Sequence, residues 1–508
     1  MSLVPGTMGE STWLTPLKKQ CFVVAGVCLN LGGYGLVMGF AAILLPQLRQ
    51  PDSLIPIDDS SGSWIASILG FALVVGNFIA PTIMAKYGRR IANIVSITPL
   101  IIGWICVLTA SSVALLLIAR FFQGVAMGMS SSIGPVLIGE YTSPKNRGAF
   151  LTAISLTLAT AVLSVHTLGS YLSWHWTAVI CCLVALVDLL IVICSPESPS
   201  WLADQSRYEE SRKIFRWLRG YDEEEELKKM IEASIVVNES KVEANINRSI
   251  VKSFKANIAY FSTTLRKKEF YKPIFIMIHI YILGQWGGIN ILAAYTTDVF
   301  KNIIGTELDI AVMIITLDVQ RIISNTTAIY VIKKIKRRTM LFATVSVNIL
   351  GFVAISGYVY AKAQNILPFD HPAIGILLIH IHMLSIATGT VPLPYVIAGE
   401  LFPLEYRSLA GGISILFLSS NLFITLKTFP LLVNTIGLSG AYLLYAAVVG
   451  YCLIVAGVFL PETKDRTLQD IEEEFRGRPL SPEELKSVQS LTSLKPYNRD
   501  RSCSSPMI

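Results

Sequence analysis

Charged residues are scarce in this chain. Lys, Arg, Asp and Glu make up 15% of its 508 residues while 53% are hydrophobic, whereas an average soluble domain has about 25% charged residues. The shortage excludes an ordinary soluble protein, and we expect the chain to have a lipid bilayer as its solvent. The eight cysteines lie in apolar segments or near the C-terminus, so no outer loop offers a disulfide pair and packing is their expected role.

Signs of catalysis are also missing. No metal-ligand spacing and no combination of nucleophile and base is visible, which argues against an enzyme and against a cofactor. A net charge of +7 would fit an anionic partner, but the basic residues lie beside apolar segments, where they orient a membrane protein. We therefore expect no nucleic-acid partner. No feature of the sequence specifies an oligomeric state.

Twelve stretches are apolar and long enough to cross a membrane as helices, which takes roughly 20 residues. They lie near residues 20–47, 63–85, 91–110, 113–140, 147–171, 174–194, 273–299, 308–333, 339–361, 371–400, 407–433 and 439–460. The sequence therefore predicts an all-α membrane protein with twelve transmembrane helices, six in each half.

The domains follow from these spans. We predict a cytosolic N-terminus (1–19), an N-terminal six-helix bundle (20–194), a cytosolic helical linker (195–272), a C-terminal six-helix bundle (273–460) and a partly disordered cytosolic tail (461–508). Lys and Arg concentrate in the loops of one side, which places that side and both termini in the cytosol. We expect a multi-pass protein of the cell membrane. Its linker is either a solvated helical connection or a latch that grips both halves.

Several short motifs occur twice, about half a chain apart. Glu140 and Arg147 recur as Glu400 and Arg407, with the same spacing of seven. The other pairs are Gly88-Arg89-Arg90 with Lys336-Arg337-Arg338, and Pro196-Glu197-Ser198 with Pro461-Glu462-Thr463. The offsets of 260, 248 and 265 residues far exceed the roughly 20 to 50 residues of a solenoid repeat. They predict two related halves, which in a membrane protein is typical of a transporter with its site between them.

These motifs belong to a longer pattern. It consists of Gly88-Arg89-Arg90, Arg120 with Gly124, Glu140 to Arg147, PESPSWL at 196–202, GQWGGIN at 284–290, the proline pair before Glu400, and PETKDRTL at 461–468. The pattern resembles the sugar porters of the major facilitator superfamily over nearly the whole chain. Within that group it is most similar to the facilitated trehalose and glucose transporters of insects. The resemblance implies two pseudo-symmetric six-helix bundles that rock about a central sugar site.

The repeated charges are candidate gate residues. Because Glu140 and Glu400 end the fourth and tenth spans, each carboxylate can meet an arginine where water has limited access, and bidentate pairs suit that place. The candidate gating set is Arg89, Arg90, Glu140, Arg147, Arg337, Glu400 and Arg407. Such pairs would hold the inner face closed and break when it opens; ordinary interfacial anchoring is the alternative. The family's usual acid before Gly88 is Ala85 here, which implies a looser N-terminal latch.

The first span contains no acidic residue. A proton symporter needs a carboxylate that loads and releases a proton inside the membrane. Related proton-coupled porters carry an Asp after the Gly-Tyr of this span, where this chain has Gly35. Arg120, which resembles the partner of that Asp, is kept. We therefore expect transport without proton coupling, and Asp188, His166 and His380 remain as other intramembrane candidates for a proton site.

The expected solute site lies near mid-membrane, where interrupted helices expose polar backbone groups. Gln285 and Asn290 flank a glycine pair, and their amides can bind sugar hydroxyls. Tyr395 follows two prolines and can stack on a pyranose ring. The candidate substrate-binding residues are Gln285, Asn290, Tyr395, Ser155, Trp286 and Arg321.

Arg321 departs most from the family, which has an asparagine there. An arginine at that depth is costly unless it is paired, and Asp318 lies one turn away. Arg321 therefore either forms a structural ion pair with Asp318 or enters the cavity and changes the solute. The expected function is facilitative transport of a hexose or trehalose across the plasma membrane by alternating access. The alternatives are a solute sensor with little transport, or a carrier of a polyol or another small polar solute.

Overall fold

The computed structural model describes residues 15–245, 264–305, 308–367, 371–402, 407–464, 466 and 468–477, and within these ranges the regular structure is helical. The first half contains α1 (Pro16–Leu48), α2 (Asp59–Tyr87), α3 (Arg89–Leu108), α4 (Val113–Tyr141), α5 (Pro144–Tyr171) and α6 (Trp174–Cys194). The linker contains α7 (Pro199–Asp204), α8 (Tyr208–Arg219) and α9 (Glu224–Asn245). The second half contains α11 (Lys268–Trp286), α12 (Ile289–Ala294), α13 (Thr296–Ile304), α14 (Ile310–Lys334), α15 (Arg337–Ala363), α16 (Pro372–Ser385), the π-helical turn η1 (Ile386–Thr390), α17 (Pro392–Leu401), α18 (Arg407–Phe459) and α19 (Leu468–Arg476).

The twelve predicted spans are all helical. Ten helical segments of the described chain are long and apolar enough to cross a membrane. One of them, Leu409–Phe459, contains two spans because the backbone leaves helical geometry at Gly437. The 25-residue helix α14 supplies the remaining span. The prediction of an all-α fold with twelve transmembrane helices is therefore confirmed.

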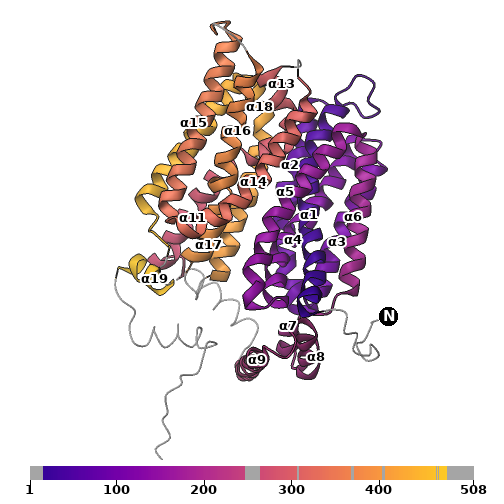
Figure 1. Ribbon diagram of the computed structural model, residues 1–508, viewed down its shortest axis with the longest axis vertical. Helices are drawn as coiled ribbons and strands as arrows, with labels where there is room; N and C mark the ends of the chain where they lie inside the picture. Colours follow the sequence, from indigo (N-terminus) through magenta and orange to yellow (C-terminus); the bar gives the residue numbers. More distant parts are fainter. Residues whose placement is uncertain are drawn as a thin grey trace, which may run out of the picture.

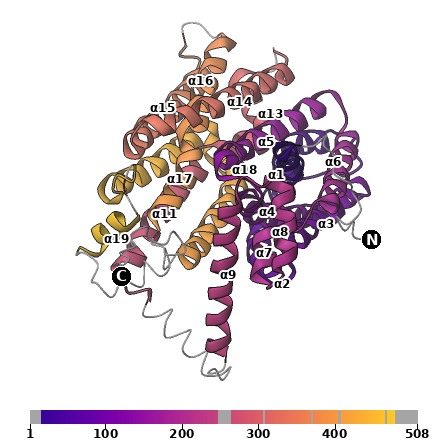
Figure 2. The ribbon, with the colours of Figure 1, turned by 60° about the horizontal axis from the view of Figure 1, so that its bottom comes forward.

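The helices form two bundles that stand side by side, α1–α6 in one and α11–α18 in the other (Figure 1). The linker helices α7–α9 lie below the N-terminal bundle, and α19 lies below the C-terminal bundle. We call this side the linker end and the opposite side, where α1 finishes and α13 lies, the far end. Figure 2 views the molecule with the linker end turned forward and shows α8 near α1 and α19 near α11, in agreement with their contacts.

The linker is fastened to the N-terminal bundle. Gln20 of α1 donates its side-chain amide to the carbonyl of Leu218 in α8 (3.2 Å), and the Trp201 indole donates to the carbonyl of Ala85 in the last turn of α2 (3.2 Å). Arg219 donates to the carbonyl of Glu140 at the end of α4 (3.1 Å). The predicted linker residues 246–263 and the predicted disordered tail from 478 onward lie outside the described residues.

Two spans of the C-terminal bundle are interrupted halfway. The seventh breaks at Gly287-Gly288, where Gly288 has φ +102 and a side chain would meet Nε2 of His382 at 3.0 Å. The tenth widens into η1 immediately before Pro392, and a π turn accommodates the hydrogen bonds that proline cannot make. Both breaks occur in spans that carry predicted substrate-binding residues.

Candidate functional site

The break in the seventh span brings two predicted side chains together. Asn290 donates its amide to the side-chain oxygen of Gln285 (2.5 Å), although α11 and α12 are separate helices. Trp286 donates its indole N–H to Asn421 of α18 (3.1 Å) and packs on Tyr445, with ring centroids 4.7 Å apart. The pairing leaves the nitrogen of Gln285 and the side-chain oxygen of Asn290 without a hydrogen-bond partner among the described residues.

Aromatic hydroxyls extend this site. Tyr395 of α17 is 56% exposed, and its ring centroid lies 6.3 Å from that of Tyr281. Tyr281 lies one helical turn before Gln285 on the same side of α11. Tyr34 of α1 interacts electrostatically with Tyr395 and with Arg321 of α14. Tyr281, Tyr395, Gln285 and Asn290 therefore form a polar lining in the C-terminal bundle.

Ser155 lies apart from this lining in its contacts. Its side chain is exposed, and its hydroxyl donates to the carbonyl of Thr152 in the preceding turn of α5 (3.0 Å). None of the other predicted substrate-binding residues shares a described hydrogen bond with it. Ser155 stays a prediction.

A buried pair joins the two bundles in the half of the molecule nearer the far end. His166 of α5 and Asp318 of α14 approach to 2.6 Å between Nδ1 and Oδ2, and their side chains are 2% and 5% exposed. Nε2 of His166 faces the carbonyl of Ala293 in α12 at 3.3 Å. The alternative pairing of Asp318 with Arg321 is not formed within 4 Å. The sequence missed this contact because residues 152 positions apart carry no local signal of proximity.

Arg120 is fully buried in the N-terminal bundle. Its guanidinium donates to the carbonyls of Val37 in α1 (2.9 Å) and Ile65 in α2 (3.2 Å), and to the side chain of Gln123 (3.0 Å). The partners of Arg120 are therefore neutral oxygens that do not take up protons near neutral pH. Its partner in the first span is the backbone carbonyl of Val37.

The two other intramembrane candidates for a proton site lie away from the bundle interface. Asp188 is buried in α6 beside α1, and its carboxyl oxygens have no hydrogen-bond partner in the described chain. Nδ1 of His380 lies 2.9 Å from the carbonyl oxygen of Ile376, one turn earlier in α16. Neither residue contacts the polar lining.

The repeated motifs form two clusters at the linker end. In the N-terminal cluster, Arg89, Glu140, Glu197 and Ser198 meet: Arg89 contacts Glu140 (2.9 Å, Nη2 to Oε1), Glu197 accepts the backbone N–H of Arg89 (2.8 Å), and the Ser198 hydroxyl donates to Glu140. The C-terminal cluster repeats these contacts. Arg337 contacts Glu400 (2.9 Å), Glu462 accepts the backbone N–H of Arg337 (2.8 Å), and the Thr463 hydroxyl donates to Glu400 (2.6 Å). Each cluster lies within one bundle, so neither joins the two halves in this conformation.

The remaining gate candidates have other surroundings. Arg90 donates its backbone N–H to Glu197 (3.0 Å) and its side chain to the carbonyl of Ile193. Arg147 lies 3.9 Å from Glu226 of the linker and not beside Glu140. Arg407 begins α18, and its side chain lies outside the described part of the chain.

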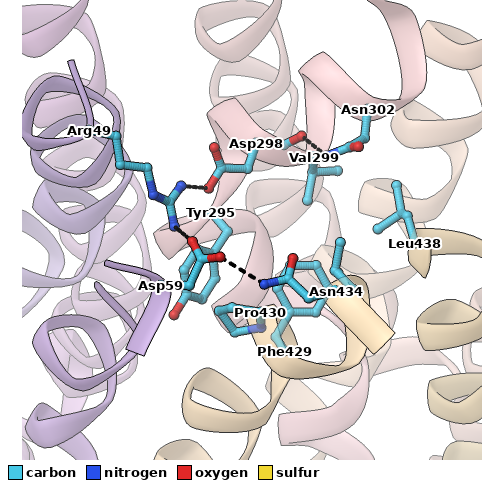
Figure 3. A pocket seen from close by; sticks show the side chains of 11 residues that line it. Arg49, Asp59, Tyr295, Asp298, Val299, Asn302, Phe429, Pro430, Asn434 and Leu438 are labelled. Atoms are coloured by element: carbon cyan, nitrogen blue, oxygen red, sulfur yellow. Dashed lines mark hydrogen bonds and ion pairs between the residues drawn. The ribbon is translucent and has the colours of Figure 1, made fainter. Parts of the chain in front are cut away.

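Contacts between the bundles concentrate at the far end. Arg49, which follows α1, lies 2.8 Å from Asp298 of α13 and 3.7 Å from Asp59 of α2, and Asn434 of α18 donates to Asp59 (2.9 Å) (Figure 3). These residues line a pocket of about 240 Å³. Lys427 of α18 donates to Ser63 of α2 (2.7 Å) and stands 4.1 Å from the ring centroid of Trp64.

The position of these contacts defines the conformation. Within the described ranges, every hydrogen bond or ion pair between the two bundles lies at the far end or in the half nearer to it. The far end is therefore closed, and none of the residues that the structure describes bridges the linker end in this way. Two six-helix bundles that enclose a polar lining and close at one end define a membrane transporter.

Comparisons with known proteins agree with this class. Residues 22–475 match the family model described as "Sugar (and other) transporter". The chain belongs to this sugar transporter family of the major facilitator superfamily. The family members that it matches are transporters and not enzymes. Its relatives include facilitated trehalose transporters of Drosophila yakuba and Culex quinquefasciatus, each 26% identical. The matches cover 94% and 95% of this chain; the chain spans about half (54%) of the first relative and 90% of the second.

Solved structures show the same fold. The inward-open xylose transporter XylE from E. coli matches 90% of this chain and 99% of its own with a TM-score of 0.71 at 17% identity. The proton:xylose symporter XylE bound to 6-bromo-6-deoxy-D-glucose matches 91% of this chain and 100% of its own with a TM-score of 0.69 at 18% identity. The chain thus has the fold of these transporters and belongs to the sugar transporter family.

Proposed function

We propose that this protein is a facilitative carrier of a hexose or trehalose, which crosses the plasma membrane by alternating access without proton coupling. The class of solute rests on the family, and trehalose rests on the facilitated trehalose transporters among the relatives. Both termini and the linker face the cytosol in this proposal, because the basic loops lie at the linker end.

The observation that carries the absence of coupling is the environment of Arg120. A coupled carrier needs a carboxylate that gains and loses a proton during each cycle. Here the arginine is held by the carbonyls of Val37 and Ile65, and these oxygens do not titrate. Solute binding at the lining therefore has no protonation step of this kind to drive it.

Uptake into proteoliposomes tests this function. The purified chain is reconstituted and supplied with glucose, fructose, trehalose or inositol, with and without an inward proton gradient. We expect saturable uptake of a hexose or trehalose at a rate that the proton gradient leaves unchanged. Uptake accelerated by the gradient would contradict the uncoupled mechanism, inositol as the sole transported solute would identify a polyol carrier, and binding without flux would identify a sensor.

The alternating-access step has its own test at the far end. Asp298→Asn removes the carboxylate that Arg49 contacts across the bundles, so the far end should open more often. In a Val433→Cys background, an impermeant maleimide added from the far side should label this variant about threefold faster, an increase that corresponds to less than 1 kcal/mol. Asp52→Asn removes the same charge from an exposed loop residue and should leave labelling unchanged. Equal labelling of all three proteins would contradict a gate at this position.

A further inference from the structure

Arg321 occupies the inward face of α14, halfway along the helix. The buried residues Ile314, Leu317, Asp318, Ser324 and Ala328 recur at helical spacing, and Arg321 falls among them. The opposite face carries the exposed Val319 and Ile323. The guanidinium therefore leaves the helix toward the interior of the protein and not toward lipid.

The guanidinium has no partner in the described chain. It makes no hydrogen bond there and no ion pair within 4 Å. None of its nitrogens is fully buried without a hydrogen-bond partner, so each keeps some accessible surface. It interacts electrostatically with Asp318 and with Tyr34 of α1 at longer range. The carboxylate that would neutralise it one turn away is instead engaged by His166 across the bundle interface.

The carboxylate of Asp318 is occupied by another contact. Its Oδ2 lies 2.6 Å from Nδ1 of His166, and Nε2 of the same ring lies 3.3 Å from the carbonyl oxygen of Ala293. Asp318 is therefore held across the bundle interface and is not within 4 Å of the guanidinium of Arg321.

The lining near this charge is polar and uncharged. Tyr34 links Arg321 electrostatically to Tyr395, and Tyr395 leads through Tyr281 toward Gln285. These hydroxyl and amide groups can bind the hydroxyls of a pyranose. A cation without a counter-charge in the membrane interior is costly, and an anionic group on the solute would remove that cost by a charge-assisted hydrogen bond.

We propose that the carrier takes an acidic sugar, with the carboxylate of a hexuronate or aldonate on Arg321 and its hydroxyls on the tyrosine and amide lining. This inference rests on the proposed function and narrows its substrate class. It also makes transport electrogenic, because each uncoupled cycle moves one negative charge.

The test compares glucose with glucuronate in proteoliposomes. The wild-type chain should take up glucuronate with a KM at least about tenfold below that for glucose, and an inside-negative potential should slow glucuronate but not glucose. Arg321→Gln should abolish that preference, and Arg321→Lys should keep part of it. Lys301→Gln, which removes an exposed far-end charge, should behave as wild type. Glucose uptake with no glucuronate uptake or competition, or a preference unchanged in Arg321→Gln, would overturn the inference.

Binding separates this inference from the transport function. Quenching of tryptophan fluorescence in detergent is titrated with sodium glucuronate, with glucose and sodium chloride as references. Wild-type protein should bind glucuronate at least about tenfold more tightly than Arg321→Gln does. Selective binding without any flux would reject the carrier function and uphold the anion site. Equal binding by both proteins would reject the anion site even if glucose is transported.

Discussion

The N-terminal and C-terminal clusters at the linker end are two versions of one arrangement. In both, the contact from the arginine to the glutamate is 2.9 Å, a hydroxyl donates to that glutamate, and a second glutamate accepts the backbone N–H of the arginine at 2.8 Å. The two halves therefore preserve the polar contacts that hold their own helices together. Because each cluster stays inside its bundle, the pair stabilises rigid bodies that can move relative to each other.

The two clusters differ in backbone and in electrostatics. Gly88 enters α3 with φ +99, whereas Lys336 enters α15 with φ −61. Burial raises the pKa of Glu197 above its ordinary value, in spite of three backbone N–H donors. Burial also acts on Glu462, but four backbone N–H groups outweigh it and the pKa is lowered. The two clusters therefore make the same contacts with different backbone conformations before the arginine, and burial has a larger net effect on Glu197 than on Glu462.

Gly88→Ala, compared with Lys336→Ala, should give the largest difference in stability between the two clusters. Its backbone conformation disfavours a side chain, and a Cβ would lie 2.3 Å from Oε2 of Glu197. We expect a loss of about 3 kcal/mol in stability. Lys336→Ala, at the equivalent exposed position with ordinary φ, should change stability by less than about 0.5 kcal/mol. Thermal unfolding of both variants in detergent makes the comparison, and similar losses would show that the backbone difference is unimportant.

The same comparison shows what sequence predicts well. The matching motifs located both clusters, because a charged residue at the end of a long apolar helix must find a partner. They did not explain why the second copy lacks the glycine. The reason is that Ile335 and Lys336 separate α14 from α15, whereas Gly88 alone separates α2 from α3. The one-residue turn at Gly88 takes φ +99, a conformation that favours glycine, whereas Lys336 in the two-residue turn has φ −61, which any residue adopts.

Contacts between the halves could not be predicted in this way. His166 with Asp318 and Arg49 with Asp298 join residues far apart in sequence, and neither pair belongs to a repeated motif. The helix breaks, by contrast, were visible as Gly287-Gly288 and as the prolines of the tenth span. Local backbone conformation depends on a few neighbouring residues, whereas the packing of two bundles depends on the whole fold.

Removal of the central carboxylates should give the next largest effect. Glu140→Gln leaves Arg89 without a full counter-charge, and we expect a loss of about 2 kcal/mol. Glu400→Gln should cost less, because the Glu400 side chain is 29% exposed and that of Glu140 is 16%. Asp222→Asn, on the exposed linker surface, is the control for lost charge. Unfolding temperatures ranked Glu140→Gln, Glu400→Gln, Asp222→Asn from lowest to highest are expected; the reverse order would assign the greater role to the C-terminal cluster.

The hydroxyls should matter less than the carboxylates. Ser198 donates to Glu140 and also caps α7 by accepting the N–H of Trp201 (3.4 Å), so Ser198→Ala should lose about 1.5 kcal/mol. Thr463→Ala loses its hydrogen bond to Glu400 and should cost about 1 kcal/mol. Ser198→Thr and Thr463→Ser keep the hydroxyl and test whether the two copies are interchangeable. Exchange variants that unfold as easily as the alanine variants would show that shape and not the hydrogen bond decides.

The smallest effect should appear in the pH dependence. The lowered pKa of Glu462 gives stability that is present above its ordinary value of 4.5 and is lost as pH falls through the folded pKa. The raised pKa of Glu197 has the opposite sign: acidification from above its folded pKa toward 4.5 stabilises the folded chain. Between pH 7 and 4, the advantage of wild type over Glu462→Gln should therefore shrink, while its stability relative to Glu197→Gln should rise. Each change should shift the unfolding temperature by less than about 4 °C, and curves that run parallel for all three proteins would remove the electrostatic difference between the clusters.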